Sequence, residues 1–114
     1  MGKLLGPAEI LREALDSIAK KVQLALLYGS VAAHRDTAHS DFDLLLISDD
    51  LTLEEIYEAL TPAEKRLGRP INPTLYTHSE FRKRLERRNP FLVKLLAGET
   101  IPLMGNKDDF IAAG

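Results

Sequence analysis

Two short apolar runs constrain the fold of this chain more than any other feature of its sequence. The first runs from Val22 to Tyr28 and is closed by Gly29, and the second runs from Asp41 to Ile47, beginning with acids and then becoming wholly apolar. Runs of this length without polar alternation are typical of strands that are covered on both faces. The sequence therefore predicts two buried central strands of a sheet.

The segments around these runs carry the start and stop signals of helices. Pro7 stands at a first-turn position, and Thr52, Thr61 and Thr77 each open a Thr-x-x-Glu capping box. Because Thr61 repeats the box of Thr52 and Pro62 follows it, we expect two helical pieces to meet near Leu60. The expected helices are Pro7 to about Lys20, Thr52 to Leu60, Thr61 to Gly68, Thr77 to Arg88, and Asn89 to about Ala97.

Two further strands are expected later in the chain. Residues Ile71 to Tyr76 mix β-branched and aromatic side chains with Pro73, which favours a strand at a sheet edge because proline cannot donate to a ladder. The segment from Thr100 to Met104 is short and apolar enough for a last strand, and the tail from Gly105 is expected to be weakly ordered.

Composition bounds the class of protein. A chain of 114 residues is long enough for one core, so we expect a single domain over residues 1–114. Its net charge of −2 excludes an overall positive field that would draw it to nucleic acid or to an anionic membrane. It has no cysteine, which excludes disulfides, thiolate catalysis and cysteine zinc sites, and no apolar run of the ~20 residues that a membrane span needs. These observations favour a cytoplasmic protein.

Asp41 and Asp43 are the strongest candidates for chemistry. Residues i and i+2 of a strand point to the same face and lie about 7 Å apart along the chain. Both carboxylates can therefore reach one cation, and a charged pair at the start of an apolar strand is costly without such a partner. Mg²⁺ prefers hard oxygen ligands and commonly takes one or two carboxylates together with substrate phosphates. We therefore expect Asp41 and Asp43 to bind Mg²⁺.

Gly29 and Ser30 form the second candidate element. A glycine at the end of a buried strand lets the backbone approach a ligand closely, and the serine hydroxyl and following amides can donate to phosphate. A helix that begins near Val31 would direct its positive end toward that phosphate. Alone, each of these patterns is more often a plain turn or a solvated strand end.

Taken together, these patterns resemble a known family. A strand, Gly29-Ser30, a short insertion, Ser40-Asp41-Phe42-Asp43 and a second apolar strand are similar to the signature of the nucleotidyltransferase superfamily related to DNA polymerase beta. In size the chain resembles the minimal nucleotidyltransferases of bacteria and archaea. The resemblance spans roughly Leu24 to Phe81. It implies an α/β (α+β) fold with a mixed sheet of about four strands and helices packed on it.

The resemblance also implies an activity and a site. The reaction would be attack of an acceptor hydroxyl on the α-phosphorus of a nucleoside triphosphate, with ATP as the expected nucleotide and pyrophosphate as the product. Asp41 and Asp43 would be the catalytic residues and the Mg²⁺ ligands. The nucleotide-binding residues would be Gly29, Ser30, Arg35 and Ser40. Minimal members often work beside a separately encoded helical partner protein, which is therefore a candidate partner here.

Two departures from the family pattern bear on turnover. Minimal members often carry Arg and Gly shortly after Gly-Ser, whereas this chain has its first arginine there only at Arg35. The family also places a third carboxylate on a later strand, as a metal ligand and base for the acceptor hydroxyl. Counting back from Thr77, that position falls at Thr74, with Asn72 on the same strand face as second choice. Neither side chain can act as a base.

Two hypotheses about function follow. The first is a Mg²⁺-dependent nucleotidyltransferase with an unidentified acceptor. The second is a catalytically impaired module of the same fold, antitoxin-like or regulator-like, that binds a nucleotide or a protein. A basic cluster at residues 82–88 could hold nucleic acid or an acidic partner, but it is more simply a solvated helix face, since few aromatic residues interleave it. His34 and His39 flank the expected site and are candidate phosphate contacts.

Overall fold

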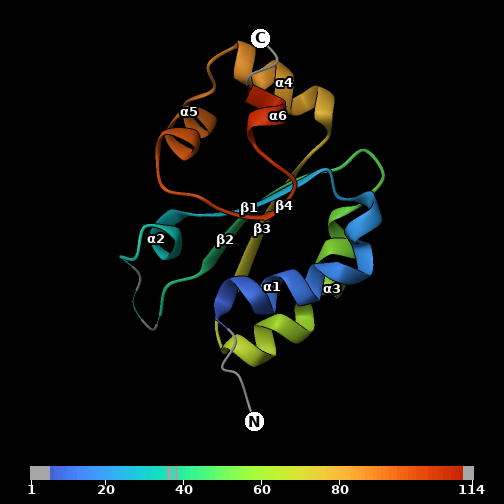
Figure 1. Cartoon of the computed structure of the whole chain (residues 1–114), viewed down its shortest axis with the longest axis vertical. Coiled ribbons are helices and arrows are strands. Elements are labelled where there is room, and N and C mark those ends of the chain that lie inside the picture. The colour runs from blue at the N-terminus through green and yellow to red at the C-terminus, as the bar shows by residue number, and fades with distance from the viewer. Residues whose placement is uncertain (1–5, 36, 38, 112–114) are drawn as a thin grey trace.

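The computed structural model describes residues 6–35, 37 and 39–111 (Figure 1). In this part of the chain the strands form one four-stranded sheet in the order β3-β2-β1-β4. β2 is antiparallel to β1 and parallel to β3, and β4 is antiparallel to β1. The sheet is therefore mixed, which confirms the expected fold class. The strands are β1 (Leu24–Tyr28), β2 (Phe42–Ile47), β3 (Ile71–Tyr76) and β4 (Ile101–Met104).

Helices lie on both faces of the sheet (Figure 1). α1 (Pro7–Leu15) and α3 (Leu53–Leu67) pack on one face, which we call the α1/α3 face. α4 (His78–Glu86) and α5 (Pro90–Ala97) pack on the other, the α4/α5 face, where Phe110 of α6 (Asp108–Ile111) joins them. α1 ends at Leu15 and continues as the 3₁₀ helix η1 (Asp16–Lys21), so the first helical segment has nearly its expected length in two forms.

Alternation along the strands gives each face its own hydrophobic cluster. β2 sends Leu44 and Leu46 to the α1/α3 face and Leu45 and Ile47 to the α4/α5 face, and all four are fully buried. The helices contribute the remaining side chains of each cluster. The α1/α3 cluster includes Leu11, Leu15, Ile56, Leu60 and Ala63, and the α4/α5 cluster includes Phe81, Leu92 and Leu95.

One expected break in the helices is wrong. α3 continues through Pro62 as a single helix, although Pro62 cannot donate to the carbonyl of Glu58. The hydroxyl of Thr61 donates to the carbonyl of Tyr57 at 2.8 Å instead of capping a new helix. Leu60 and Ala63, on either side of the break, are both buried in one cluster. Tertiary packing of a continuous apolar face thus outweighs the local breaker.

The other local signals are confirmed where the structure describes them. Thr52 and Thr77 form complete capping boxes, and the side chain of Asn89 caps α5. β3, which contains Pro73, is an edge strand. The tail is more ordered than expected, because Phe110 of α6 packs edge-on against Phe81 at a ring distance of 6.1 Å. No helix in the described ranges is both long and apolar enough to cross a membrane.

Candidate functional site

A polar row crosses three strands at one end of the α4/α5 face. Tyr28 pairs with Asp43, and Asp43 pairs with Asn72. The next row of the same face is already mostly apolar, and the third continues the cluster. Asn72 is exposed and Asp43 is half-buried, so the row lies where the helical cover ends. The second row consists of Leu26, Leu45 and Thr74, and the third of Leu24, Ile47 and Tyr76.

The carboxylates of Asp41 and Asp43 meet around Asn72. The side-chain amide of Asn72 donates to Oδ2 of Asp41 at 2.8 Å. Burial raises the pKa of Asp43, the negative charge of Asp41 raises it further, and a hydrogen bond from Asn72 offsets part of the rise. Binding of a cation or a proton at Asp43 therefore stabilises the folded chain.

This pair of carboxylates fits a hard divalent cation. Two carboxylates with open solvent access are the protein ligands that Mg²⁺ commonly takes, with water and phosphate oxygens completing its shell. Among the residues that the structure describes, no group of three or more His, Cys, Asp or Glu side chains is placed to hold a metal. The protein ligands of a cation here would be Asp41 and Asp43.

Gly29 joins the two sequence motifs. It has a φ of +80°, and a Cβ built on it would lie 2.6 Å from Oδ2 of Asp43. Only a residue without a side chain therefore allows the carboxylate to lie against the backbone at the end of β1. The serine of the motif follows directly, at the start of the cleft described below.

The helix at the motif begins earlier than expected and is short. α2 (Gly29–Ala32) begins at Gly29 rather than near Val31 and has four residues. A single turn aligns few peptide dipoles, so the expected helix dipole contributes little at Ser30. The backbone closes after this turn through a hydrogen bond from Arg35 N to the Ser30 carbonyl at 2.8 Å. That bond holds Arg35 next to the motif.

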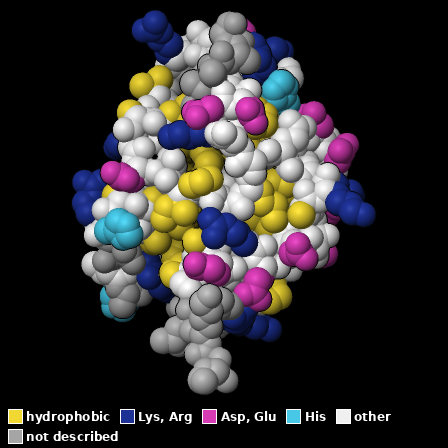
Figure 2. Space-filling model, viewed as in Figure 1, with side chains coloured by type: hydrophobic (Ala, Val, Ile, Leu, Met, Phe, Trp, Pro, Cys, Tyr) yellow, Lys and Arg dark blue, Asp and Glu magenta, His cyan; other side chains and the backbone are white. Residues whose placement is uncertain are grey.

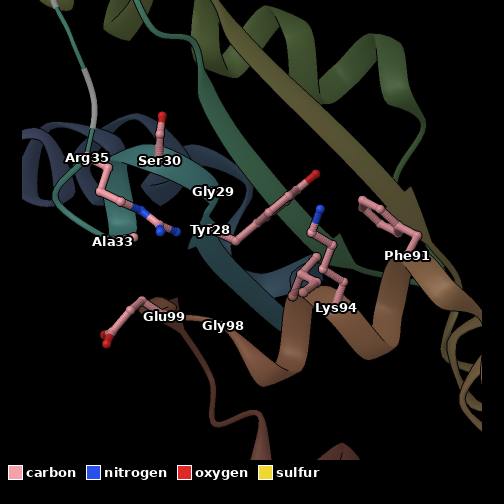
Figure 3. Close-up of a pocket in the computed structure, with 10 residues that line it drawn as sticks. Tyr28, Gly29, Ser30, Ala33, Arg35, Phe91, Lys94, Gly98 and Glu99 are labelled. Carbon is pink, nitrogen blue, oxygen red and sulfur yellow. The ribbon is translucent and has the colours of Figure 1, made fainter.

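A cleft of about 610 Å³ separates α2 from α5 (Figure 3). Its α2 wall includes three of the expected nucleotide-binding residues, Gly29, Ser30 and Arg35. Asp41 and Asp43 do not line it but adjoin it through Gly29. The remaining lining residues are Tyr28, Ala33, Phe91, Lys94, Leu95, Gly98 and Glu99.

Ser40 lies elsewhere. Its hydroxyl accepts from the backbone N–H of Thr37 at 2.9 Å, and its carbonyl accepts from Nε of Arg69 at 2.7 Å. These contacts order the backbone that enters Asp41, and Ser40 is not among the lining residues of the cleft. In the structure Ser40 thus lies directly before Asp41 and outside the lining of the cleft.

The register decides between the two positions considered for a third carboxylate. Asn72 lies directly beside Asp43, whereas Thr74 lies one row further on, beside Leu45. Thr74 instead forms a hydrogen bond with the hydroxyl of Tyr28, which offsets part of the rise that burial causes in the pKa of Tyr28. The geometry therefore favours the second choice, Asn72, over Thr74.

Sequence reasoning missed the α5 wall of the cleft. Phe91 is 41% exposed, and its ring stands edge-on to that of Tyr28 at a centroid distance of 5.8 Å. No sequence motif pointed to Lys94 or Glu99 as residues of the site. Lys94 interrupts an apolar stripe at helical spacing, Phe91-Lys94-Leu95-Gly98, and a charge within such a stripe is the signal that could have found the wall.

The basic cluster lies apart from this cleft. Lys83, Arg84 and Arg87 line a separate groove of about 380 Å³, and the Arg84 guanidinium lies 5.0 Å above the ring of Tyr76. In Figure 2, basic side chains are visible at the end of the molecule that carries α4, and on the rest of this face acidic and basic side chains alternate around an apolar middle. His34 and His39 are exposed and do not line the cleft.

Comparison with known proteins identifies relatives of this arrangement. The family model described as "Polymerase beta, Nucleotidyltransferase" matches residues 10–92. No protein with a curated description matches the chain significantly.

Several solved structures share the fold at low identity. A toxin-antitoxin with AMP-PNP is 18% identical with a TM-score of 0.63, covering 92% of this chain and 78% of that one. A mutant of the toxin-antitoxin MntA-HpeT is 17% identical with a TM-score of 0.64, covering 95% and 80%. A tri-AMPylated Shewanella oneidensis HEPN toxin in complex with MNT antitoxin gives 17% identity and a TM-score of 0.58, covering 93% and 76%.

Proposed function

The chain belongs to the polymerase beta nucleotidyltransferase family, and from this premise we propose that it is a Mg²⁺-dependent enzyme that transfers a nucleoside monophosphate from ATP to a hydroxyl acceptor. Nucleotidyl transfer is the activity of the family. The nucleotide, the metal and the acceptor are the parts that we propose.

One observation carries the proposal. The carboxylate of Asp43 lies directly against the Gly29-Ser30 turn, since a Cβ at Gly29 would lie 2.6 Å from Asp43 Oδ2. A phosphate chain in the cleft beside Ser30 and Arg35 would therefore lie next to the carboxylates. Phosphoryl chemistry requires this juxtaposition, because charge develops on the phosphorus oxygens and on the leaving group together.

The reaction can be stated in terms of bonds. The acceptor oxygen forms a bond to the α-phosphorus, the bond from that phosphorus to the bridging oxygen breaks, and pyrophosphate leaves with that oxygen. Mg²⁺ held by Asp41 and Asp43 would neutralise developing negative charge. Ser30 and Arg35 bind and orient the phosphates. The acceptor's proton would pass to solvent, since Asn72 and Thr74 offer no base and Asp41 and Asp43 would be engaged by the cation.

The acceptor is proposed to be a hydroxyl on a partner protein. The neighbours of known structure are toxin-antitoxin complexes, one of them with AMP-PNP and one with a tri-AMPylated toxin. These properties belong to those proteins, and they motivate the choice of acceptor here. Asp41 and Asn72 are exposed, so a macromolecular hydroxyl can approach the carboxylates.

A second function is favoured by Asn72. Its amide occupies the place beside Asp43 and donates to Asp41 at 2.8 Å, so two carboxylates, not three, face a cation here. A site of this kind can bind a nucleotide with Mg²⁺ and turn it over slowly or not at all. This is the binding-module hypothesis, in which nucleotide occupancy controls association with a partner.

Titration of ATP into the purified protein, with and without Mg²⁺, separates these functions when pyrophosphate release is followed in the same samples. Mg²⁺-dependent binding with release supports the enzyme, and Mg²⁺-dependent binding without release supports the module. Absence of ATP binding overturns both. Asn72→Asp should raise Mg²⁺ affinity and pyrophosphate release by adding a third carboxylate beside Asp43. Thr74→Asp, one row away, is the matched control.

A further inference from the structure

The α5 wall of the cleft presents one cation. Phe91, Lys94, Leu95 and Gly98 are spaced three and four residues apart, so they share one side of α5, and all four line the cleft. Lys94 is the only charged member of this stripe. It therefore faces the space between α5 and α2, opposite Ser30 and Arg35.

The backbone of Lys94 is held firmly in this place. The side chain of Asn89 accepts from the backbone N–H groups of Phe91 and Leu92 at 3.0 and 3.2 Å, which caps the first turn of α5. Leu92 and Leu95, on either side of Lys94, are buried in the α4/α5 cluster. The helix is thus anchored on the sheet, which holds the backbone of Lys94 at the wall of the cleft.

Among the described residues, neither Arg35 nor Lys94 of the cleft forms an ion pair. Within the described ranges the ion pairs are Lys21 with Glu55 and Arg66 with Glu13, and neither involves the cleft. In Figure 3 the Arg35 guanidinium points from the α2 wall into the cleft, the Lys94 side chain rises from the α5 wall beside the Tyr28 ring, and the carboxylate of Glu99 points away from the cleft. Two facing cations repel each other unless an anion lies between them.

We propose that Lys94 binds the terminal phosphates of the nucleoside triphosphate across the cleft from Arg35 and makes the site selective for triphosphates over monophosphates. This inference rests on the proposed function. Lys94 would thereby supply, from α5, positive charge that the segment after Gly29-Ser30 provides only at Arg35. The α-phosphate lies nearer Gly29 and Asp43, so the loss of Lys94 should affect a monophosphate much less.

Calorimetric titration of ATP and AMP in the presence of Mg²⁺ tests this assignment. Lys94→Gln should weaken ATP binding about 10- to 100-fold, as expected for a hydrogen bond to a charged group, and AMP binding by less than about threefold. Lys94→Arg should restore most of the ATP affinity because it restores the charge. Equal losses for ATP and AMP, or no loss for either, would overturn the role of Lys94.

Lys107→Gln is the matched control. Lys107 lines an adjoining groove that shares Arg35 and Glu99 with the cleft, and its amino group donates to the Thr100 hydroxyl at 3.3 Å. Removing this charge should change ATP affinity by less than about threefold, because solvent and salt screen a cation outside the contact. A loss equal to that of Lys94→Gln would indicate a diffuse field and would contradict a specific contact.

Inorganic tripolyphosphate separates failure of this inference from failure of the proposed function. If the unmodified protein binds ATP and Lys94→Gln keeps its preference for ATP over AMP, the inference fails and the proposed function stands. If the protein binds tripolyphosphate in a Lys94-dependent way but not ATP, the phosphate contact stands and the proposed nucleotide is wrong. If it binds neither, both fail.

Discussion

The two faces of the sheet are built from the same strands but differ at one end of those strands. On the α1/α3 face the cluster extends to the ends of the strands, where Phe42 and Ile71 are buried. On the α4/α5 face the corresponding end carries Tyr28, Asp43 and Asn72 in one row. The apolar cluster therefore reaches this end of the strands on the α1/α3 face, which we call the closed face, and stops one row short of it on the α4/α5 face, which we call the open face.

Helix length explains the difference. α3 has 15 residues and rises about 22 Å, which is enough to span a six-residue strand of about 20 Å. α4 and α5 have nine and eight residues, so each rises only about 12–14 Å. The two short helices cover the apolar rows of the α4/α5 face. In the polar row α5 reaches Tyr28 through Phe91, whereas Asp43 stays half-buried and Asn72 exposed.

Leu44→Ala should break the closed face and give the largest loss of stability. Leu44 is fully buried in the α1/α3 cluster and precedes Leu45, which faces the opposite way. Truncation removes apolar contacts and leaves a cavity, so the free energy of unfolding should fall by about 2–5 kcal/mol in urea titration. A loss below about 1 kcal/mol would contradict the tight packing of this face.

Gly29→Ala should disturb the open face by a different mechanism. A Cβ at this position meets Asp43 Oδ2 at 2.6 Å, in addition to the cost of a φ of +80°. Gly68→Ala has a φ of +68° but meets nothing within 4 Å, so it should cost about 1–2 kcal/mol from the backbone alone. Gly29→Ala should cost at least about 1 kcal/mol more than Gly68→Ala.

A double mutant isolates the contact between Gly29 and Asp43. Combining Gly29→Ala with Asp43→Ala should remove most of the excess cost, because the clashing carboxylate is then absent. Thermal unfolding of the four proteins of the cycle provides the measurement. An additive double mutant would show that the glycine is required for its φ and not for the approach of Asp43.

Asn89→Ala should loosen the wall that α5 builds on the open face. The lost cap leaves two backbone N–H groups of α5 without their partner, at an expected cost of about 1 kcal/mol. Thr61→Ala is the control, since its hydroxyl contacts a carbonyl within α3 and caps nothing, so its effect should stay within about 0.5 kcal/mol. Similar unfolding midpoints for the two variants would argue against the cap.

Asp43→Asn should have the smallest effect and the opposite sign. Burial and the charge of Asp41 raise the pKa of Asp43, so the ionised carboxylate is less favourable in the folded chain than in the unfolded one. This penalty is present above the folded pKa and absent below the unfolded pKa. The variant should therefore gain up to about 1 kcal/mol at pH 7, and the gain should vanish near about pH 3.

Thermal unfolding from about pH 3 to about pH 7 without divalent cations measures this gain. Asp50→Asn, an exposed acid beyond the other end of β2, is the control. A loss of stability in Asp43→Asn at neutral pH would mean that the hydrogen bond from Asn72 outweighs burial and repulsion.

The closed face and the motif residues could be predicted from the sequence because local patterns determine them. The apolar runs of β1 and β2, the caps at Thr52, Thr77 and Asn89, and the edge position of Pro73 each follow from a few neighbouring residues. The continuity of α3 could not be predicted in this way, because burial of Leu60 and Ala63 against distant elements outweighs Pro62.

The open face was less predictable because it depends on register and on helix placement. The pairing of β2 with β3 places Asn72 beside Asp43, whereas counting back from Thr77 put Thr74 first and Asn72 second. The cleft could be predicted only if the placement of α5 opposite α2 were known, and these two segments are about 60 residues apart in the chain. The local sequence around Lys94 therefore could not place it at the cleft.

We propose that Asp43 and the Gly29-Ser30 turn form one cation-dependent nucleotide site on the open face. The most direct test is the affinity for ATP, with and without Mg²⁺, of the unmodified protein, Asp43→Asn and Asp50→Asn. Mg²⁺ should strengthen ATP binding by at least about tenfold in the unmodified protein and in Asp50→Asn, and this gain should be lost in Asp43→Asn. An equal increase in ATP affinity with Mg²⁺ in all three proteins would mean that Asp43 does not hold the cation.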